Sequence, residues 1–224
     1  MKLSTLLIIA AGLSGSAFAQ DRFDMKVRND FFAGFAGNRQ ALDRAMKMCD
    51  EALAKDPRNP EALVWHGAGT FYLSGQSFQA GDRAKGQQLW QSGLQEMEQA
   101  VQIAPDRVGV RIPRGATLLT ASRNLPNPAM ARPLIETAVG DYARALEVQS
   151  QSFDSLGVHP RGELLIGLAD GYARLGNEDQ ARIYFERIRA ALPGSVYAAS
   201  ADKWLATKTL APRESGCLGC HVAK

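Results

Sequence analysis

A recurring spacing of small and large residues is the feature that most limits what this chain can fold into. Four times along the chain a small residue is followed by a large one four positions on, and by another residue three positions later. The four sets are Ala45-Cys49-Ala52, Gly93-Met97-Ala100, Ala138-Tyr142-Ala145 and Ala181-Phe185-Ile188, of which the last ends on a large residue. Offsets of four and three lie on one face of an α-helix. The pattern therefore predicts helices that approach one another closely through small residues.

These sets belong to a longer internal repeat. A shift of the chain by 48 residues superposes Ala52 on Ala100, Leu53 on Val101, Pro57 on Pro105, Val64 on Ile112 and Gly67 on Gly115. Strand signatures are nearly absent, and Ala, Leu, Arg, Gln and Glu dominate the periodic segments. Glycine and proline fall between those segments. We therefore expect an all-α fold of antiparallel helix pairs.

The repeat resembles the tetratricopeptide repeat, a helix–turn–helix unit that stacks into an array. Residues 51–63 read like the end of one unit and the start of the next, and the resemblance covers roughly residues 38–193. One nearly complete unit is formed by Leu165, Leu168, Ala169, Tyr172, Gly176, Ala181, Phe185 and Pro193. The units recur every 43 to 48 residues, whereas the family repeats about every 34. We expect the extra residues in a longer turn around residues 76–85 and between Leu146 and Pro160.

A capping helix is predicted for residues 195–210. Ser195 is a suitable N-cap, and Pro212 lies just past the end. One face of this helix carries Tyr197, Ala201, Trp204, Leu205 and Lys208. We expect that face to cover the last repeat, since the terminal units of a stack need a cap.

The beginning of the chain has the three-part pattern of a secretory signal peptide. Lys2 precedes an apolar run at residues 6–11, and Ala17-Phe18-Ala19 precedes Gln20. The sequence therefore predicts a signal peptide at 1–19, a helical repeat domain at 20–210 and a linker with a tail at 211–224, in a periplasmic or otherwise exported protein. The formal net charge of +3 indicates neither a nucleic-acid binder nor a polybasic membrane binder, and no membrane span is expected.

The tail contains Cys217-Leu218-Gly219-Cys220-His221, which has the spacing of a c-type haem-attachment site. Two cysteines three positions apart reach the two vinyl groups of one haem, and the adjacent histidine is the proximal iron ligand. A zinc site would need four ligands, and a thioredoxin-like dithiol would need a βαβ context. A structural disulfide is the remaining alternative. We predict one covalent haem c per chain.

The motif lies near the end of the sequence, a position that resembles the cytochrome c′ class. Three residues follow His221, too few for the common small cytochrome c fold. Residues 211–216 can span at most about 20 Å. The sequence therefore predicts a haem at the edge of the helical body, near Trp204.

The sequence does not decide which residue is the distal ligand of the haem iron. His159 is the tentative candidate, from an expected turn before Pro160, and Met130 is a weaker one. His66 is expected to be a packed or groove-lining residue. Cys49 is expected to be a buried small hydrophobe, and Gly67-Ala68-Gly69 is interpreted as close helix packing. The aromatic side chains of Trp65, Phe71 and Tyr72 are expected in the core or along a groove.

The leading functional hypothesis is a non-enzymatic electron-transfer protein, a periplasmic monohaem cytochrome c on a repeat scaffold. Its partner would be a redox protein or a membrane-associated respiratory complex, with self-association a further option. One alternative is a haem-free repeat scaffold for protein–protein interaction. The other is an open-site haem protein that binds a small gas ligand.

Overall fold

The structure is a computed structural model, and it describes residues 22–209. The helices within that range are α1 Phe23–Phe35, α2 Arg39–Lys55, α3 Pro60–Gln79, α4 Arg83–Ile103, α5 Val108–Ala121, α6 Pro128–Val148, α7 Val158–Arg174, α8 Glu178–Ala191 and α9 Val196–Thr207. Two short 3₁₀ segments, η1 Ser122–Asn124 and η2 Phe153–Ser155, flank α6. Residues 22–209 contain no strand. The all-α prediction is thus confirmed for this part of the chain.

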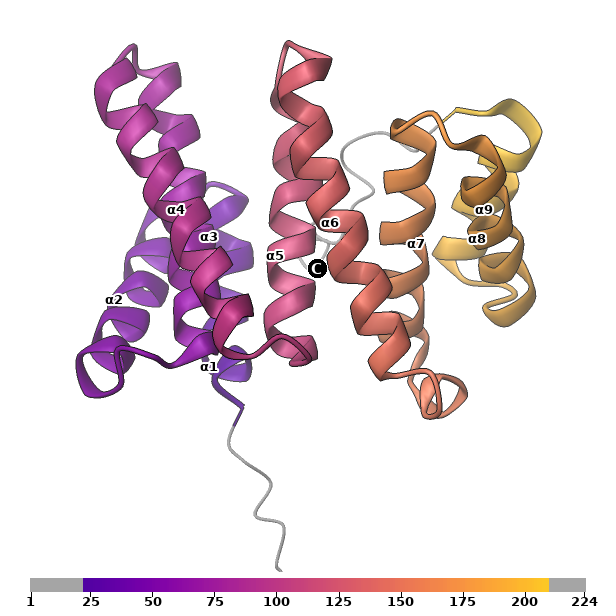
Figure 1. The fold of residues 1–224 in the computed structure, drawn as a ribbon, viewed down its shortest axis with the longest axis horizontal. Helices are drawn as coiled ribbons and strands as arrows, with labels where there is room; N and C mark the ends of the chain where they lie inside the picture. Colours follow the sequence, from indigo (N-terminus) through magenta and orange to yellow (C-terminus); the bar gives the residue numbers. More distant parts are fainter. Residues whose placement is uncertain (1–21, 210–224) are drawn as a thin grey trace, which may run out of the picture.

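The helices form four antiparallel pairs in chain order, α1/α2, α3/α4, α5/α6 and α7/α8, with α9 packed on α8 (Figure 1). The first helices of successive pairs also contact one another, α1 with α3, α3 with α5, and α5 with α7. This is the stacked arrangement of a helical repeat. None of the helices in residues 22–209 is long and apolar enough to cross a membrane.

Three of the four turns within pairs share a glycine followed by a capping residue. Gly37, Gly81 and Gly176 have positive φ angles of 108°, 84° and 80°. This conformation ends a helix, and glycine adopts it without the steric strain that a Cβ atom would cause. The next residue in each case, Asn38, Asp82 or Asn177, accepts a hydrogen bond from a backbone N–H in the first turn of the following helix. The turn between α5 and α6 lacks the glycine and contains η1 instead.

Helices approach one another closely through small residues, as the repeat pattern predicts, and in two pairs a glycine of the first helix faces a large residue of the second. A Cβ atom added to Gly67 would lie 2.9 Å from the Gly93 carbonyl oxygen and 3.0 Å from the Met97 side chain. One repeat later, a Cβ on Gly115 would lie 3.2 Å from the ring of Tyr142. These contacts explain why glycine recurs at this repeat position.

Most of the recurring small positions are buried. The predicted contact residues Ala45, Gly93, Ala100, Ala138, Ala145 and Ala181 are all buried. Ala52 is an exception, since it is only partly buried near the end of α2.

The extra residues of the longer repeat are found in one of the two places expected. Residues 149–157 do form a longer connection, with η2 inside it. The expected long turn at residues 76–85 is wrong, because α3 and α4 run for 20 and 21 residues and leave only residues 80–82 between them. The extra residues of that unit lengthen its helices instead.

The capping helix is shorter than predicted. Ser195 does cap it, its Oγ accepting a hydrogen bond from the Ala198 N–H at 3.1 Å. The helix ends at Thr207 rather than residue 210, and Lys208 adopts a left-handed conformation there. Trp204 is buried and stacks on Phe185 of α8 with ring centroids 4.5 Å apart, so α9 covers the last pair.

We predict opposite effects for alanine at two glycines of α3. Gly67→Ala forces its new methyl group against the backbone of α4, and we expect it to lower the free energy of unfolding by about 1–3 kcal/mol. Gly75→Ala meets no atom within 4 Å, and we expect it to raise the free energy of unfolding by up to about 1 kcal/mol through helix propensity. Urea unfolding measures both. Equal effects at the two sites would contradict the close α3–α4 contact.

Candidate functional site

The residues with the strongest sequence signal lie outside the part that the structure describes. Cys217, Cys220 and His221, like the signal peptide at 1–19, fall beyond residues 22–209. The described residues hold no group of three or more His, Cys, Asp or Glu side chains arranged to bind a metal.

His159 lies in the first turn of α7, and the expectation of a turn at this position is wrong. Proline is compatible with the first turn of a helix, so Pro160 does not prevent α7 from starting here. The imidazole Nδ1 lies 2.9 Å from the Tyr197 hydroxyl, and Nε2 lies 3.8 Å from Glu163. His159 thus links α7 to α9, and its role as distal ligand stays a prediction.

Met130 lies in the first turn of α6 and is 55% exposed. Because α6 and α7 are antiparallel, the first turn of α6 and the first turn of α7 lie at opposite edges of the array (Figure 1). Met130 and His159 therefore cannot serve the same haem face together. The fold therefore does not place Met130 and His159 at one haem site.

His66 is a packed residue, as expected, and it joins three helices. Its Nδ1 lies 2.6 Å from Glu96 of α4, and its Nε2 lies 3.3 Å from Asp50 of α2. The hydrogen bond with Glu96 raises the pKa of His66 above its ordinary value of 6.5, while burial opposes the rise. This contact belongs to the packing of the first two pairs.

The other sequence candidates are core residues. Cys49 is fully buried, and burial raises the pKa of its thiol well above the usual range, so it is not a reactive thiolate. Trp65 stacks on Phe31 with ring centroids 5.1 Å apart, and Phe71 lies 4.3 Å from Trp90. Of the three aromatic residues singled out in the sequence, Tyr72 alone is partly exposed.

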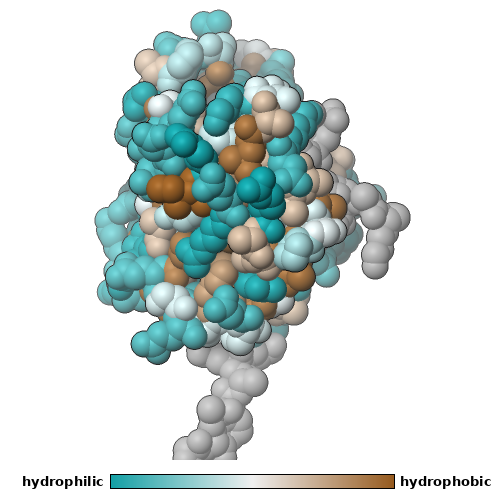
Figure 2. Space-filling model, turned by 90° about the vertical axis from the view of Figure 1, so that its right-hand side faces the viewer, coloured by the Kyte–Doolittle hydropathy of each residue, from teal (hydrophilic) through white to brown (hydrophobic). Residues whose placement is uncertain are grey.

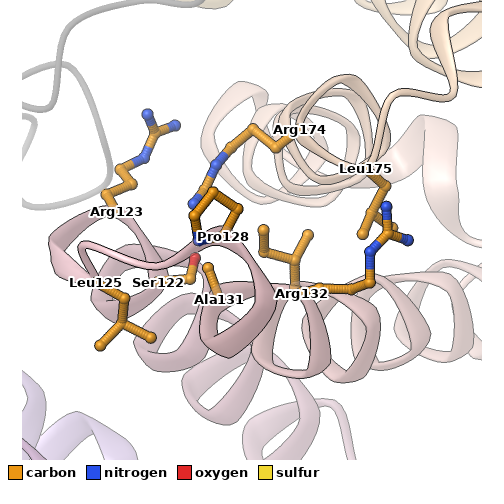
Figure 3. A pocket seen from close by; sticks show the side chains of 9 residues that line it. Ser122, Arg123, Leu125, Pro128, Ala131, Arg132, Arg174 and Leu175 are labelled. Atoms are coloured by element: carbon orange, nitrogen blue, oxygen red, sulfur yellow. The ribbon is translucent and has the colours of Figure 1, made fainter.

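A basic pocket of about 450 Å³ opens where the turn between α5 and α6 meets the end of α7. Figure 3 shows Arg123 from η1, Arg132 from α6 and Arg174 from α7 on different sides of it. The lining residues are Ser122, Arg123, Leu125, Pro128, Ala131, Arg132, Ile135, Arg174 and Leu175. We call this site the three-arginine pocket.

A single carboxylate holds two of the three arginines. Asp170 of α7 pairs with Arg123, and its second oxygen lies 3.9 Å from Arg174. Burial raises the pKa of the Asp170 carboxyl, and the two guanidinium groups oppose that rise. The Arg174 Nη1 also donates to the Leu119 carbonyl oxygen at 2.9 Å. The third arginine, Arg132, pairs with exposed Glu136 at 3.3 Å. Three arginines against two carboxylates leave the pocket with one excess positive charge.

A second cavity, of about 260 Å³, lies between α4, α5 and α6 and is mainly apolar. At its rim Arg114 donates to Glu98 at 2.5 Å and to fully buried Asp141 at 2.6 Å and 2.8 Å. Arg111 donates to the same carboxylate at 2.7 Å. This network fastens α5 to α6 and to α4, and because all its members are paired we interpret it as structural.

No sequence pattern predicted the three-arginine pocket. Its arginines come from three separate elements, and no spacing along the chain brings them together. The available signal was the absence of a Gly-Asn or Gly-Asp pair between α5 and α6, where the other three pairs have one. That absence marks the turn that opens the pocket.

Comparisons with known proteins add little. No family model and no curated protein matches the chain. Among solved structures, a thermophilic TPR protein from Thermus thermophilus is 18% identical, with 83% of this chain and 100% of that chain covered and a TM-score of 0.42. A likeness this low decides neither fold nor function. The helical-repeat description rests on the contacts within the chain itself.

We predict that the His66 contact stabilises the fold more at low pH than at high pH. Since the folded-state pKa is raised, the contribution is fully present below pH 6.5 and is lost as the pH rises through the folded-state value. His66→Gln should therefore lower the free energy of unfolding by about 1 kcal/mol more near pH 5.5 than near pH 9.

Urea unfolding of wild type, His66→Gln, Glu96→Gln and the double variant at the two pH values measures this coupling. The Glu96→Gln background serves as the control, because it removes the group that raises the pKa. A coupling that grows with pH would contradict the assignment.

Proposed function

We propose that the helical body is an exported docking scaffold, and that the tail motif gives it one covalent haem c for electron transfer. The protein would then be a periplasmic monohaem c-type cytochrome and not an enzyme. The observation that carries the haem is the Cys217-Leu218-Gly219-Cys220-His221 sequence. The scaffold part is supported by the array of helix pairs in residues 22–209.

The donor set of the motif fits a haem. The Sγ atoms of Cys217 and Cys220 would form thioethers with the two vinyl groups, and the imidazole of His221 would bind the iron. A haem held this way accepts and releases one electron, and the protein sets its exposure and its electrostatic surroundings. The third cysteine, Cys49, is buried in α2 and is free, so it does not compete for the same chemistry.

The partner would be a redox protein or a membrane-associated respiratory complex, with self-association as a further option. Repeat arrays present extended surfaces rather than one deep cleft. The surface here combines charged side chains with separate exposed apolar ones, including Phe78, Ile183 and Val196. Such a mixed surface suits transient docking better than an obligate interface.

Two other functions remain alternatives, each with its own discriminating measurement. A haem-free scaffold for protein–protein interaction would show no pyridine haemochrome after production with the haem-maturation machinery. An open-site haem protein for a small gas ligand would show a five-coordinate spectrum in the ligand-free ferrous state. The array itself supports the scaffold, and the haem rests on the sequence motif alone.

We predict that Cys217→Ser and Cys220→Ser together abolish covalent haem while the helical body still folds. The core within residues 22–209 is closed without the tail, as fully buried Leu165 and Ile188 in the last pair indicate. Denaturing gel electrophoresis with haem staining measures attachment, and circular dichroism measures helicity. Retained covalent haem would contradict the motif assignment, and lost helicity would make haem part of the core.

We also predict that the mature protein begins near Gln20. The small residues Ala17 and Ala19 match the positions that signal peptidases accept. Intact mass spectrometry of the protein isolated from the periplasm measures this start. A chain that keeps its first nineteen residues would argue against export.

A further inference from the structure

The three-arginine pocket exists because one turn of the repeat departs from the others. Gly37, Gly81 and Gly176 end the first helix of their pairs in tight turns. Between α5 and α6 the chain instead continues through η1 and residues 125–126 before Asn127 caps α6. This longer connection leaves the space that Leu125 and Pro128 line.

The pocket is built to hold an anion. Asp170 is buried under it and fixes Arg123, while the Leu119 carbonyl and Asp170 together hold Arg174, whose side chain is only 13% exposed. One carboxylate thus orients two guanidinium groups and neutralises one of them. Because Glu136 pairs with Arg132, the pocket keeps one excess positive charge. Guanidinium groups held in this way bind carboxylates with short, charge-assisted hydrogen bonds.

The same pocket has an apolar floor. Ala131 and Ile135 of α6 lie one turn apart on the helix face that lines it, and Leu175 closes the far side. Its volume of about 450 Å³ falls in the range of small-molecule sites. This combination of an apolar floor and guanidinium groups fits a ligand that has an apolar body and carries carboxylate groups. A haem is such a ligand, since its macrocycle is apolar and it carries two propionates.

The pocket lies at the edge of the array where the described chain ends. Along the alternating helices α6, α7, α8 and α9, the start of α6 and the ends of α7 and α9 share one edge (Figure 1). At most two helix spacings of about 8–10 Å each separate α9 from α7, because α9 packs on α8 and α8 packs on α7, and Tyr197 of α9 also contacts His159 of α7. Residues 210–216 can span up to about 25 Å, so the tether is long enough.

The end face of the array, which α8 and α9 form, is less suited to a haem. Trp204 is 2% exposed, and the Lys208 ammonium covers its ring at 4.1 Å. Seen from that end, the surface is mostly hydrophilic with separate hydrophobic patches (Figure 2).

We propose that the haem attached at Cys217 and Cys220 docks in the three-arginine pocket, with its propionates on Arg123, Arg132 and Arg174. This inference rests on the proposed function. It replaces the sequence-based expectation of a haem beside Trp204. It also separates His159 from the docked haem, because His159 begins α7 at the opposite edge of the array.

The test uses the haem-loaded full chain with ¹³C-labelled isoleucine methyl groups. The ferric iron shifts and broadens the signals of nearby methyl groups, and the haem-free Cys217→Ser/Cys220→Ser chain is the diamagnetic reference. We expect the largest effect at Ile135 in the pocket and little at Ile103 of α4. A larger effect at Ile183 or Ile188 of α8 would place the haem on the end face and overturn the inference. The absence of any effect would overturn it as well.

A matched pair of charge reversals sharpens the result. Arg132→Glu changes an exposed pocket arginine, and Arg182→Glu changes an arginine of α8 that is similarly exposed and also paired within its own helix. We expect Arg132→Glu to weaken docking by roughly two- to fivefold, the effect of one partly exposed ion pair, with a smaller shift at Ile135. Arg182→Glu should leave Ile135 unchanged. Equal responses to the two variants would contradict the pocket.

His159→Ala provides an independent readout. If the haem docks in the pocket, the visible spectrum of this variant equals that of wild type. A changed axial-ligand band would place the haem at the opposite edge and overturn the inference, while the covalent haem, and with it the proposed function, would remain. Absence of covalent haem in the wild-type chain would overturn both.

Discussion

Close approach of helices through small residues is the constraint on which the rest of this structure depends. At Gly67 and Gly93 the backbones of α3 and α4 come so near that a Cβ on either glycine would meet the other's carbonyl oxygen within 3 Å. Large side chains of the second helices, Met97 and Tyr142, fill the space beside such contacts. Tyr142 also packs on Gly167 of α7. One ring therefore joins a pair to the pair that follows it.

Buried ion pairs join the same helices that pack through small residues. Asp141 is fully buried, and two arginines of α5 satisfy it. Breaking such a pair leaves an uncompensated buried charge, which costs far more than the intact pair contributes. Asp170 is likewise a buried carboxylate paired with two arginines, Arg123 and Arg174. The difference is that these two arginines line a pocket. The same kind of contact is structural in one place and is available to a ligand in the other.

The end of α9 and the three-arginine pocket lie at the same edge of the array because of its topology. An array of antiparallel helices returns the chain to the same edge after every pair, so the end of α9 lies at the edge where α6 begins. The three-arginine pocket lies at that edge because the turn between α5 and α6 is irregular. The tail that we propose to carry a haem therefore starts within reach of a basic, partly apolar site. A docked haem there would stay near the surface, as transfer of electrons to a partner requires.

The sequence by itself determined the all-α class, the register of the contact faces and the capping role of α9. Local spacing decides these features, because offsets of three and four place residues on one helix face. The sequence also contains Cys217-Leu218-Gly219-Cys220-His221, the spacing on which the proposed haem attachment depends. It did not determine helix lengths: the extra residues near position 80 extend α3 and α4. Only the tertiary structure brought Arg123, Arg132 and Arg174 to one pocket and put His159 against Tyr197. Those contacts join residues far apart in the chain, and they depend on how whole helices pack against one another.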